Sequence, residues 1–239
     1  MSPIDLNLYK EFAHEKLHVE FGDIQLLATA LTHRSYVNEH KKSTTSHNER
    51  LEFLGDAVLE LAVTDYLYNH YDEPEGILTS WRAALVRTES IGESGEALGY
   101  GPLLRLSRGE KQGSERARKQ IMANAFEAII GAIYLDKGYV TAETFILANI
   151  VNKLEAILAV GSWRDAKSQL QEMAQRIDGF TPIYKVLEED GPDHDKIFSL
   201  GVFVGNKLKG KGSGSSKQLA QQQAAEAAVK KYQKEASSD

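Results

Sequence analysis

Residues 47–59, HNERLEFLGDAVL, set three carboxylates into an otherwise apolar stretch: Glu49, Glu52 and Asp56. Offsets of three and four residues place all three on one face of a helix. Because like charges on one stripe repel, the pattern favours a cation between them, and a hard divalent cation is the simplest candidate. The alternative is a solvated acidic edge. We favour the metal site because Leu, Phe and Val fill most of the helix circumference, which leaves little of it to face water.

A second segment, NAFEAIIGA, repeats the pattern with Asn124 and Glu127 three residues apart in apolar surroundings. If the two helices pack together, four oxygen-bearing side chains meet: Glu52, Asp56, Asn124 and Glu127. Mg²⁺ prefers oxygen ligands and keeps several waters, so a substrate phosphate can complete its coordination. The metal would polarise a scissile phosphate and lower the pKa of a bound water. The expected chemistry is metal-dependent hydrolysis of phosphodiesters.

The elements that must position these side chains are helices throughout the first two thirds of the chain. Apolar spacing predicts helices over residues 6–15, 23–32, 47–71, 78–90, 91–98, 116–136 and 141–158. A capping box of Ser46 and Glu49 is expected to start the carboxylate helix. Beyond a short linker the pattern changes to a helix, three strands and a helix, at residues 166–176, 182–188, 197–204, 207–213 and 216–234.

Composition limits the class of protein. The chain of 239 residues has no cysteine, which excludes disulfides and thiolate metal sites and fits a reducing compartment. Residues 1–10 have no signal-peptide pattern and no apolar run could span a bilayer, so we expect a soluble, cytoplasmic protein with no membrane partner. The net charge is −6, yet residues 196–234 carry eight lysines and one glutamate. An acidic body joined to a module with a basic end is typical of a protein that binds a phosphate backbone.

The segment HNERLEFLGD closely resembles the signature of bacterial ribonuclease III. The similarity continues through THRSY, Glu75-Gly76, Gly109-Glu110 and FEA, and it covers essentially the whole chain, whose C-terminal module is similar to a double-stranded RNA-binding domain. The resemblance implies Mg²⁺ as cofactor, with Mn²⁺ as a substitute, and no organic cofactor. It implies catalytic roles for Asp56 and Glu127. It assigns the metal to Glu52, Asp56, Asn124 and Glu127, with Glu49 and Glu75 as ancillary acids.

One residue departs from the family pattern. The family usually has an aspartate where this chain has Asn124. An amide oxygen can bind Mg²⁺ but adds no charge, so the affinity for metal should fall. Three carboxylates remain, and water can complete the coordination. The departure leaves open whether Asn124 is a natural variant or an engineered change.

The resemblance also implies a homodimer in which the carboxylate helix packs against its two-fold mate. Two active sites would then cut one strand each. The candidates for this interface are Phe53, Leu54 and Gly55, and ordinary core positions are the alternative for Phe53 and Leu54. Because Gly55 inside a helix costs about 1 kcal/mol relative to alanine, we expect another backbone to approach it closely.

The C-terminal module has three patches that together suit a duplex of RNA. Gln171 and Glu172 on its first helix could reach 2′-hydroxyls in the minor groove, and His194 between the first two strands could enter a second minor groove. The start of the last helix favours a phosphate. The residues expected there and nearby are Ser216, Lys217, Lys209 and Lys211. Taken singly, each patch would be an ordinary solvated surface.

We therefore predict an α+β protein: an all-α endonuclease domain at residues 1–158, a linker at 159–164 and an α-β-β-β-α RNA-binding domain at 165–235. The expected activity is Mg²⁺-dependent cleavage of double-stranded RNA to 5′-phosphate products with short 3′ overhangs, in the processing of ribosomal and messenger RNA. The main alternative is a duplex-RNA binder that Asn124 has disabled as a nuclease. A third possibility, a hydrolase of small nucleotides, is disfavoured by the RNA-binding module.

Overall fold

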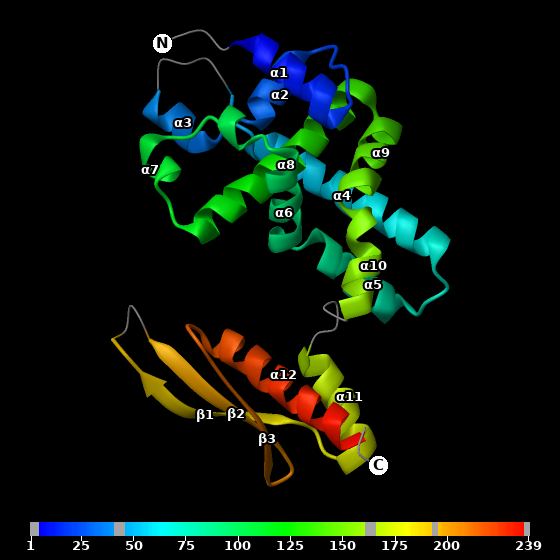
Figure 1. Ribbon diagram of the computed structural model, residues 1–239, viewed down its shortest axis with the longest axis vertical. Helices are drawn as coiled ribbons and strands as arrows, with labels where there is room; N and C mark the ends of the chain where they lie inside the picture. The colour runs from blue at the N-terminus through cyan, green and yellow to red at the C-terminus, as the bar shows by residue number, and fades with distance from the viewer. Residues whose placement is uncertain (1–4, 41–45, 161–165, 193–195, 237–239) are drawn as a thin grey trace. The chain divides into compact units, whose positions relative to one another are not determined.

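The computed structural model describes residues 5–40, 46–160, 166–192 and 196–236. The chain forms two compact units, Met1–Trp163 and Arg164–Asp239. In the described part of the first unit the regular elements are helical (Figure 1). They are α1 (Leu6–Phe12), η1 (Ala13–Leu17), α2 (Ile24–Ala30), α3 (Arg34–Glu39), α4 (Glu49–His70), α5 (Glu75–Val86), α6 (Thr88–Leu98), η2 (Gly101–Leu103), α7 (Arg108–Lys111), α8 (Glu115–Lys137), α9 (Tyr139–Asn149), η3 (Val151–Lys153) and α10 (Leu154–Val160).

The predicted helices are present, with differences at their ends. The predicted capping box is wrong: α4 begins at Glu49, its N-cap is Asn48, and no side chain caps it. Glu49 instead accepts a hydrogen bond from Arg34, on the short helix α3 that sequence periodicity did not predict. The helix expected over residues 141–158 is divided by η3 into α9 and α10, and α10 continues to Val160.

Two glycines allow α4 and α8 to cross with their backbones in contact. A Cβ built on Gly55 would lie 1.8 Å from the carbonyl oxygen of Glu127, and one built on Gly131 would lie 2.3 Å from that of Leu51. Neither position can hold a side chain without the helices moving apart. The expected close approach at Gly55 is therefore made within the chain, by α8. Around the crossing lies the core of the unit, which includes the buried side chains of Leu59, Phe126 and Ile130.

Asp136, in the last turn of α8, holds the segment that precedes α2 by hydrogen bonds. Its carboxylate accepts hydrogen bonds from the backbone N–H groups of Gly22 and Asp23, each at 2.8 Å. Burial opposes ionisation, but these two hydrogen bonds and Lys137 outweigh it and lower the pKa of Asp136. The native state thus favours the ionised carboxylate.

We expect Asp136→Ala to lower the free energy of unfolding at pH 7 by about 2 kcal/mol, because two charge-assisted hydrogen bonds are lost and two amides are left unpaired. Since the folded pKa lies below the ordinary value of 3.8, the contribution is present above that pH and is lost as the pH falls through the folded pKa. Urea unfolding from pH 7 to pH 3 tests this. A loss of stability that does not shrink toward pH 3 would contradict the assignment to the ionised group.

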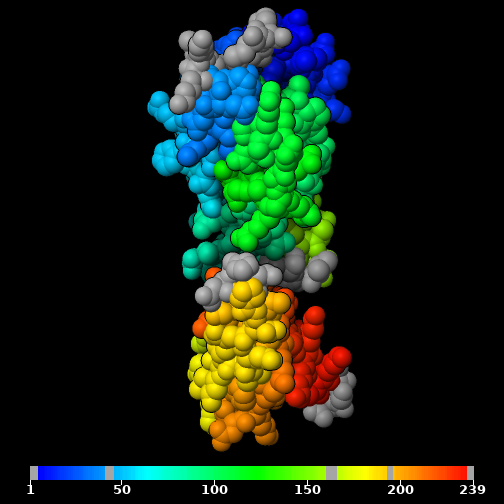
Figure 2. Space-filling view, turned by 90° about the vertical axis from the view of Figure 1, so that its left-hand side faces the viewer, coloured from blue at the N-terminus to red at the C-terminus, as the bar shows by residue number. Residues whose placement is uncertain are grey.

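The second unit has the predicted order of elements. Helix α11 (Ala166–Asp178) is followed by β1 (Ile183–Asp190), β2 (Ile197–Val204), β3 (Lys207–Gly214) and α12 (Lys217–Ala236). The strands form an antiparallel sheet in the order β1-β2-β3. Figure 1 shows α12 lying along one face of this sheet, and Figure 2 shows β1 in yellow and the following strands in orange.

Small residues let α12 lie close to the sheet. Cβ atoms built on Gly210 and Gly212 of β3 would both lie 2.3 Å from backbone atoms of Ala224. The alanines of α12 that are buried against the sheet and α11 are Ala220, Ala224, Ala225 and Ala228. Ala227 of the same helix, by contrast, is exposed.

No helix in the described ranges combines the length and the apolar character needed to cross a membrane.

Candidate active site and RNA-binding surface

The crossing of α4 and α8 positions the predicted cluster of acids. Glu52 and Asp56 of α4 flank Gly55, and Glu127 lies one turn before Gly131 on α8. Burial of Glu127, together with the negative charges of Asp56 and Glu52, raises the pKa of its carboxyl to about 8. The structure thus brings these three acids within electrostatic reach of one another, on opposite sides of one helix crossing.

Glu52 is affected in the same direction. Partial burial raises the pKa of its carboxyl, and the charges of Glu49 and Asp56 add to the effect. As the side chains lie, no three His, Cys, Asp or Glu residues of the described part of the chain are close enough to hold a metal ion. The cluster is therefore a set of mutually repelling carboxylates, and its hard oxygen donors are the type that a divalent cation such as Mg²⁺ prefers.

Asn124 lies beside the carboxylates but turns its oxygen elsewhere. Its Oδ1 accepts a hydrogen bond from Gln120 Nε2 at 2.7 Å. Its side chain also hydrogen-bonds to Glu52, which opposes the rise in the pKa of that carboxyl; an amide can do this only by donating from Nδ2. Asn124 thus stabilises the negative charge of Glu52 by donating a hydrogen bond, whereas an aspartate at this position would add a further negative charge. Sequence reasoning missed Gln120, although its spacing of four residues from Asn124 on a helix was a usable signal.

The two ancillary acids lie in different surroundings. Glu49 forms an ion pair with Arg34, with Nη1 and Oε1 3.0 Å apart, and lies 3.7 Å from His47 Nδ1. Glu75 is the first residue of α5, where it accepts a hydrogen bond from Thr79. It lines a hollow of about 390 Å³ beside the C-terminal half of α4. Within one chain, therefore, Glu49 adjoins the cluster and Glu75 is not among the groups that perturb its pKa values.

The three residues predicted for a dimer interface are not equivalent. The side chain of Phe53 is 81% exposed, and Leu54 is half-buried. Gly55 is buried and faces α8 of its own chain. The assignment of Gly55 to a dimer interface is therefore wrong, because α8 already occupies the space that a mate would need.

Most of the described residues that were predicted to bind RNA are exposed in the second unit, and one is largely buried. Gln171 and Glu172 of α11, Lys211 of β3 and Lys217 at the start of α12 are exposed. Ser216 caps α12, and its Oγ accepts from the backbone N–H of Leu219 at 3.2 Å. His194 lies outside the described residues.

Lys209 was predicted to add charge for RNA, and the structure corrects this. Its side chain is only 10% exposed, and its Nζ lies 3.3 Å from Asp178 and 3.6 Å from Glu235. The same ammonium stands 4.1 Å from the ring centroid of Tyr232, whose hydroxyl donates to Asp178. Because an extra residue bulges β3 between its pairings with Val202 and Phe203, Lys209 faces α12 and the core. Its role is structural.

Comparison with known proteins bears on both units. The family model described as Ribonuclease-III-like matches residues 23–154, and the double-stranded RNA binding motif matches residues 166–232. A Ribonuclease 3 of Listeria monocytogenes serotype 4a is 44% identical over 225 residues, which are 94% of this chain and 97% of that protein. The chain belongs to the ribonuclease III family.

Other relatives agree with that assignment. A Ribonuclease 3 of Oceanobacillus iheyensis is 46% identical over 90% of this chain and 94% of its own length. The crystal structure of the nuclease domain of ribonuclease III from Campylobacter jejuni matches with a TM-score of 0.53 and 36% identity, over 64% of this chain and 97% of that one. Membership of the ribonuclease III family confirms the predicted fold class and the predicted class of enzyme, an endoribonuclease with a double-stranded RNA-binding domain.

Proposed function

We propose that this ribonuclease III family member hydrolyses both strands of duplex RNA in a Mg²⁺-dependent reaction, with Mn²⁺ as a substitute, at a site formed by Glu52, Asp56 and Glu127. The observation that carries the proposal is the perturbed Glu127. Burial, and then the charges of Asp56 and Glu52, raise the pKa of this carboxyl to about 8. A bound divalent cation would relieve the repulsion among the three acids.

The chain's own residues would hold the cation and order its surroundings. Glu52 and Asp56 from α4 and Glu127 from α8 would supply the carboxylate oxygens. The hydrogen bond from Asn124 restrains Glu52, and Gln120 restrains Asn124 in turn. When bound, the cation supplies charge stabilisation at the scissile phosphate and lowers the pKa of the attacking water.

The proposal extends to products and substrates. We propose products with 5′-phosphates and short 3′ overhangs; the overhangs would follow from one cut on each strand at staggered positions. Structured precursors of ribosomal and messenger RNA in the cytoplasm are the substrates that suit a shape-reading RNA-binding domain.

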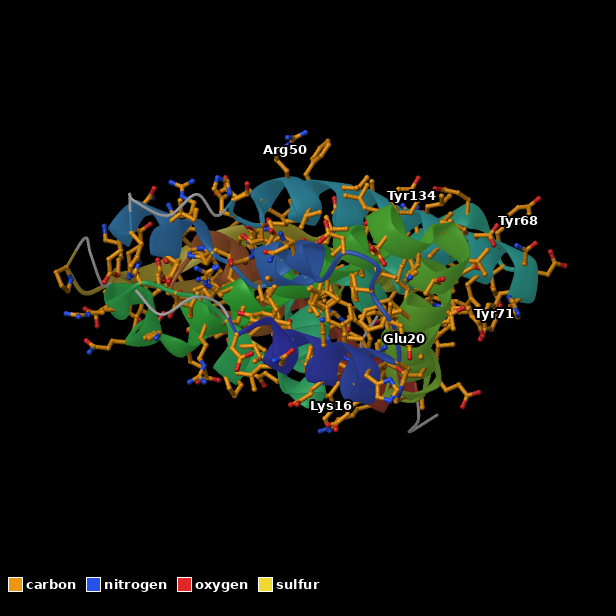
Figure 3. The ribbon with its side chains drawn as sticks, turned by 90° about the horizontal axis from the view of Figure 1, so that it is seen from above. Lys16, Glu20, Arg50, Tyr68, Tyr71 and Tyr134 are labelled. Atoms are coloured by element: carbon orange, nitrogen blue, oxygen red, sulfur yellow. The ribbon has the colours of Figure 1, made fainter. Side chains whose placement is uncertain are left out.

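We also propose that the active form is a homodimer built on α4. Besides Phe53, the exposed large hydrophobic residues of this helix are Leu61 and Tyr68, at 57% and 77%. Figure 3 shows Arg50 and Tyr68 pointing outward from α4. Exposed apolar side chains repeated along one helix are typical of a surface that a partner covers, and a two-fold mate would present the same residues.

One observation favours the non-cleaving alternative. In this structure the amide oxygen of Asn124 accepts a hydrogen bond from Gln120, and its amide nitrogen donates one to Glu52. To ligate a metal, Asn124 would have to turn over and break both hydrogen bonds. If three carboxylates do not suffice, the chain would bind duplex RNA without cutting it.

The deciding experiment titrates Mg²⁺ in the cleavage of a long, labelled RNA duplex by this chain and by Asn124→Asp. A fourth carboxylate should lower the half-saturating Mg²⁺ concentration about tenfold, which corresponds to about 1.4 kcal/mol. Asn152→Asp is the matched control, because it adds the same charge at an exposed position of η3, and it should leave the Mg²⁺ requirement unchanged.

The outcomes separate the two functions. If both proteins cut and the variant needs less Mg²⁺, the three-carboxylate site is a working nuclease. If only Asn124→Asp cuts, while this chain still shifts the duplex on a gel, the alternative is correct. If neither cuts at any Mg²⁺ or Mn²⁺ concentration, the assignment of the site is wrong.

A further inference from the structure

The first turn of α12 carries a single cation, Lys217, and this cation is already paired. Its Nζ lies 3.0 Å from Oε1 of Glu189, near the end of β1. Oε2 of the same glutamate lies 3.8 Å from Nζ of Lys196, the residue before β2. One carboxylate thus bridges two lysines of the basic end of the module.

The register of the sheet explains why Glu189 reaches α12. Across the strands Glu189 pairs with Phe198 and Phe198 pairs with Gly214, so the three residues form a row on the face that α12 covers. Gly214 has no side chain, and a Cβ there would lie 2.8 Å from the side chain of Leu219. The first turn of α12 therefore packs directly against this row of residues. Lys217 Nζ stands 5.3 Å from the ring centroid of Phe198 and meets Glu189 beside it.

We propose that Glu189 is an internal competitor for the RNA phosphate: its carboxylate holds Lys217, and a phosphate of duplex RNA must displace it to bind at the start of α12. The inference rests on the proposed function and on the phosphate contact that the sequence predicts for Lys217. It adds a residue that sets the strength of that contact and that lies outside the predicted RNA-binding set.

The energetics allow displacement. The side chains of Lys217 and Glu189 are 56% and 36% exposed, and ion pairs so accessible to water are weak. The N-terminal end of α12 favours any anion, carboxylate or phosphate. Duplex RNA brings a dense row of phosphates and gains from counterion release at each neutralised site. Glu189 therefore weakens binding to RNA without preventing it.

The test measures binding of the full chain to a labelled RNA duplex in EDTA, which prevents cleavage, over a series of salt concentrations. Glu189→Gln should lower Kd about threefold at low salt, and should steepen the slope of log K against log salt by up to about 0.9, the value for one further phosphate contact. Glu188→Gln is the matched control. It removes the same charge from the neighbouring residue of β1, which pairs with Ser199 on the opposite face of the sheet.

A second pair of variants tests whether Glu189 affects RNA binding through Lys217. In the Lys217→Gln background, Glu189→Gln should no longer strengthen binding beyond the effect of Glu188→Gln. The inference is overturned if Glu189→Gln and Glu188→Gln strengthen binding equally, if Glu189→Gln has no effect, or if it weakens binding. If Lys217→Gln itself leaves the affinity unchanged, the proposed phosphate contact fails as well. Equal thermal unfolding temperatures would show that the variants are folded.

Discussion

Glu127→Gln is expected to reduce cleavage of duplex RNA by at least about 100-fold while leaving binding to the duplex intact. Glu127 provides the most buried carboxylate of the proposed site. The glutamine amide of the variant would hold a divalent cation less well, and the site would stabilise less charge at the phosphate. Binding should persist because the RNA-binding motif belongs to the other compact unit. Glu11→Gln, at an exposed position of α1, is the control and should retain full activity.

The same variant should change how stability depends on pH. The pKa of Glu127 is raised from 4.5 to about 8 in the folded chain, so the folded state binds the proton more tightly than the unfolded state. In EDTA the free energy of unfolding should therefore fall as the pH rises from 4.5 to 8, by up to about 5 kcal/mol, and level off above that range.

In Glu127→Gln the part of this fall that is due to Glu127 should be absent, because the group no longer titrates. The part that is due to Glu52, whose pKa is also raised, should remain. For the original chain at pH 8, added Mg²⁺ should restore the lost stability, since a cation that binds only the folded state stabilises it. The measurement is urea unfolding in EDTA, followed by the fluorescence of Trp81, which is buried in the first unit. An unchanged fall with pH in Glu127→Gln would refute the assignment of the proton to Glu127.

Gly55→Ala is expected to destabilise the first unit by about 3 kcal/mol or more. The added Cβ would lie 1.8 Å from the carbonyl oxygen of Glu127 and 2.9 Å from the backbone N of Gly131, so α4 and α8 must separate and their packing is lost. Alanine favours an isolated helix over glycine by about 1 kcal/mol, so a loss of stability would identify the backbone contact as its cause.

The chain offers a matched glycine for comparison. A Cβ added to Gly76, in the first turn of α5, would meet nothing within 4 Å. Gly76→Ala should therefore leave stability unchanged or raise it by up to about 1 kcal/mol. Cleavage by any folded Gly55→Ala protein should fall further than its unfolded fraction explains, because Glu52 and Asp56 move away from Glu127. Equal effects at the two glycines would show that the crossing is not as close as described.

Much of the fold and of the site followed from local sequence patterns. Carboxylates repeated every three or four residues among apolar side chains predicted the faces of α4 and α8 that meet at the cluster. The alternation of Phe198, Leu200, Val202 and Val204 predicted β2, and the Gly205-Asn206 turn predicted its hairpin with β3. These features depend on the helical and strand periods alone, which a sequence carries directly.

What the sequence left undecided depends on which elements pack together. It predicted a close backbone approach at Gly55 but assigned it to a mate, whereas the partner is α8 of the same chain. It counted Lys209 among charges for RNA, but a bulge in β3 turns that lysine toward Asp178 and Glu235. The pairs Arg34–Glu49 and Lys217–Glu189 join residues of different elements, α3 with α4 and α12 with β1. Such contacts are set by helix crossings and strand register, and no local pattern of residue types records them.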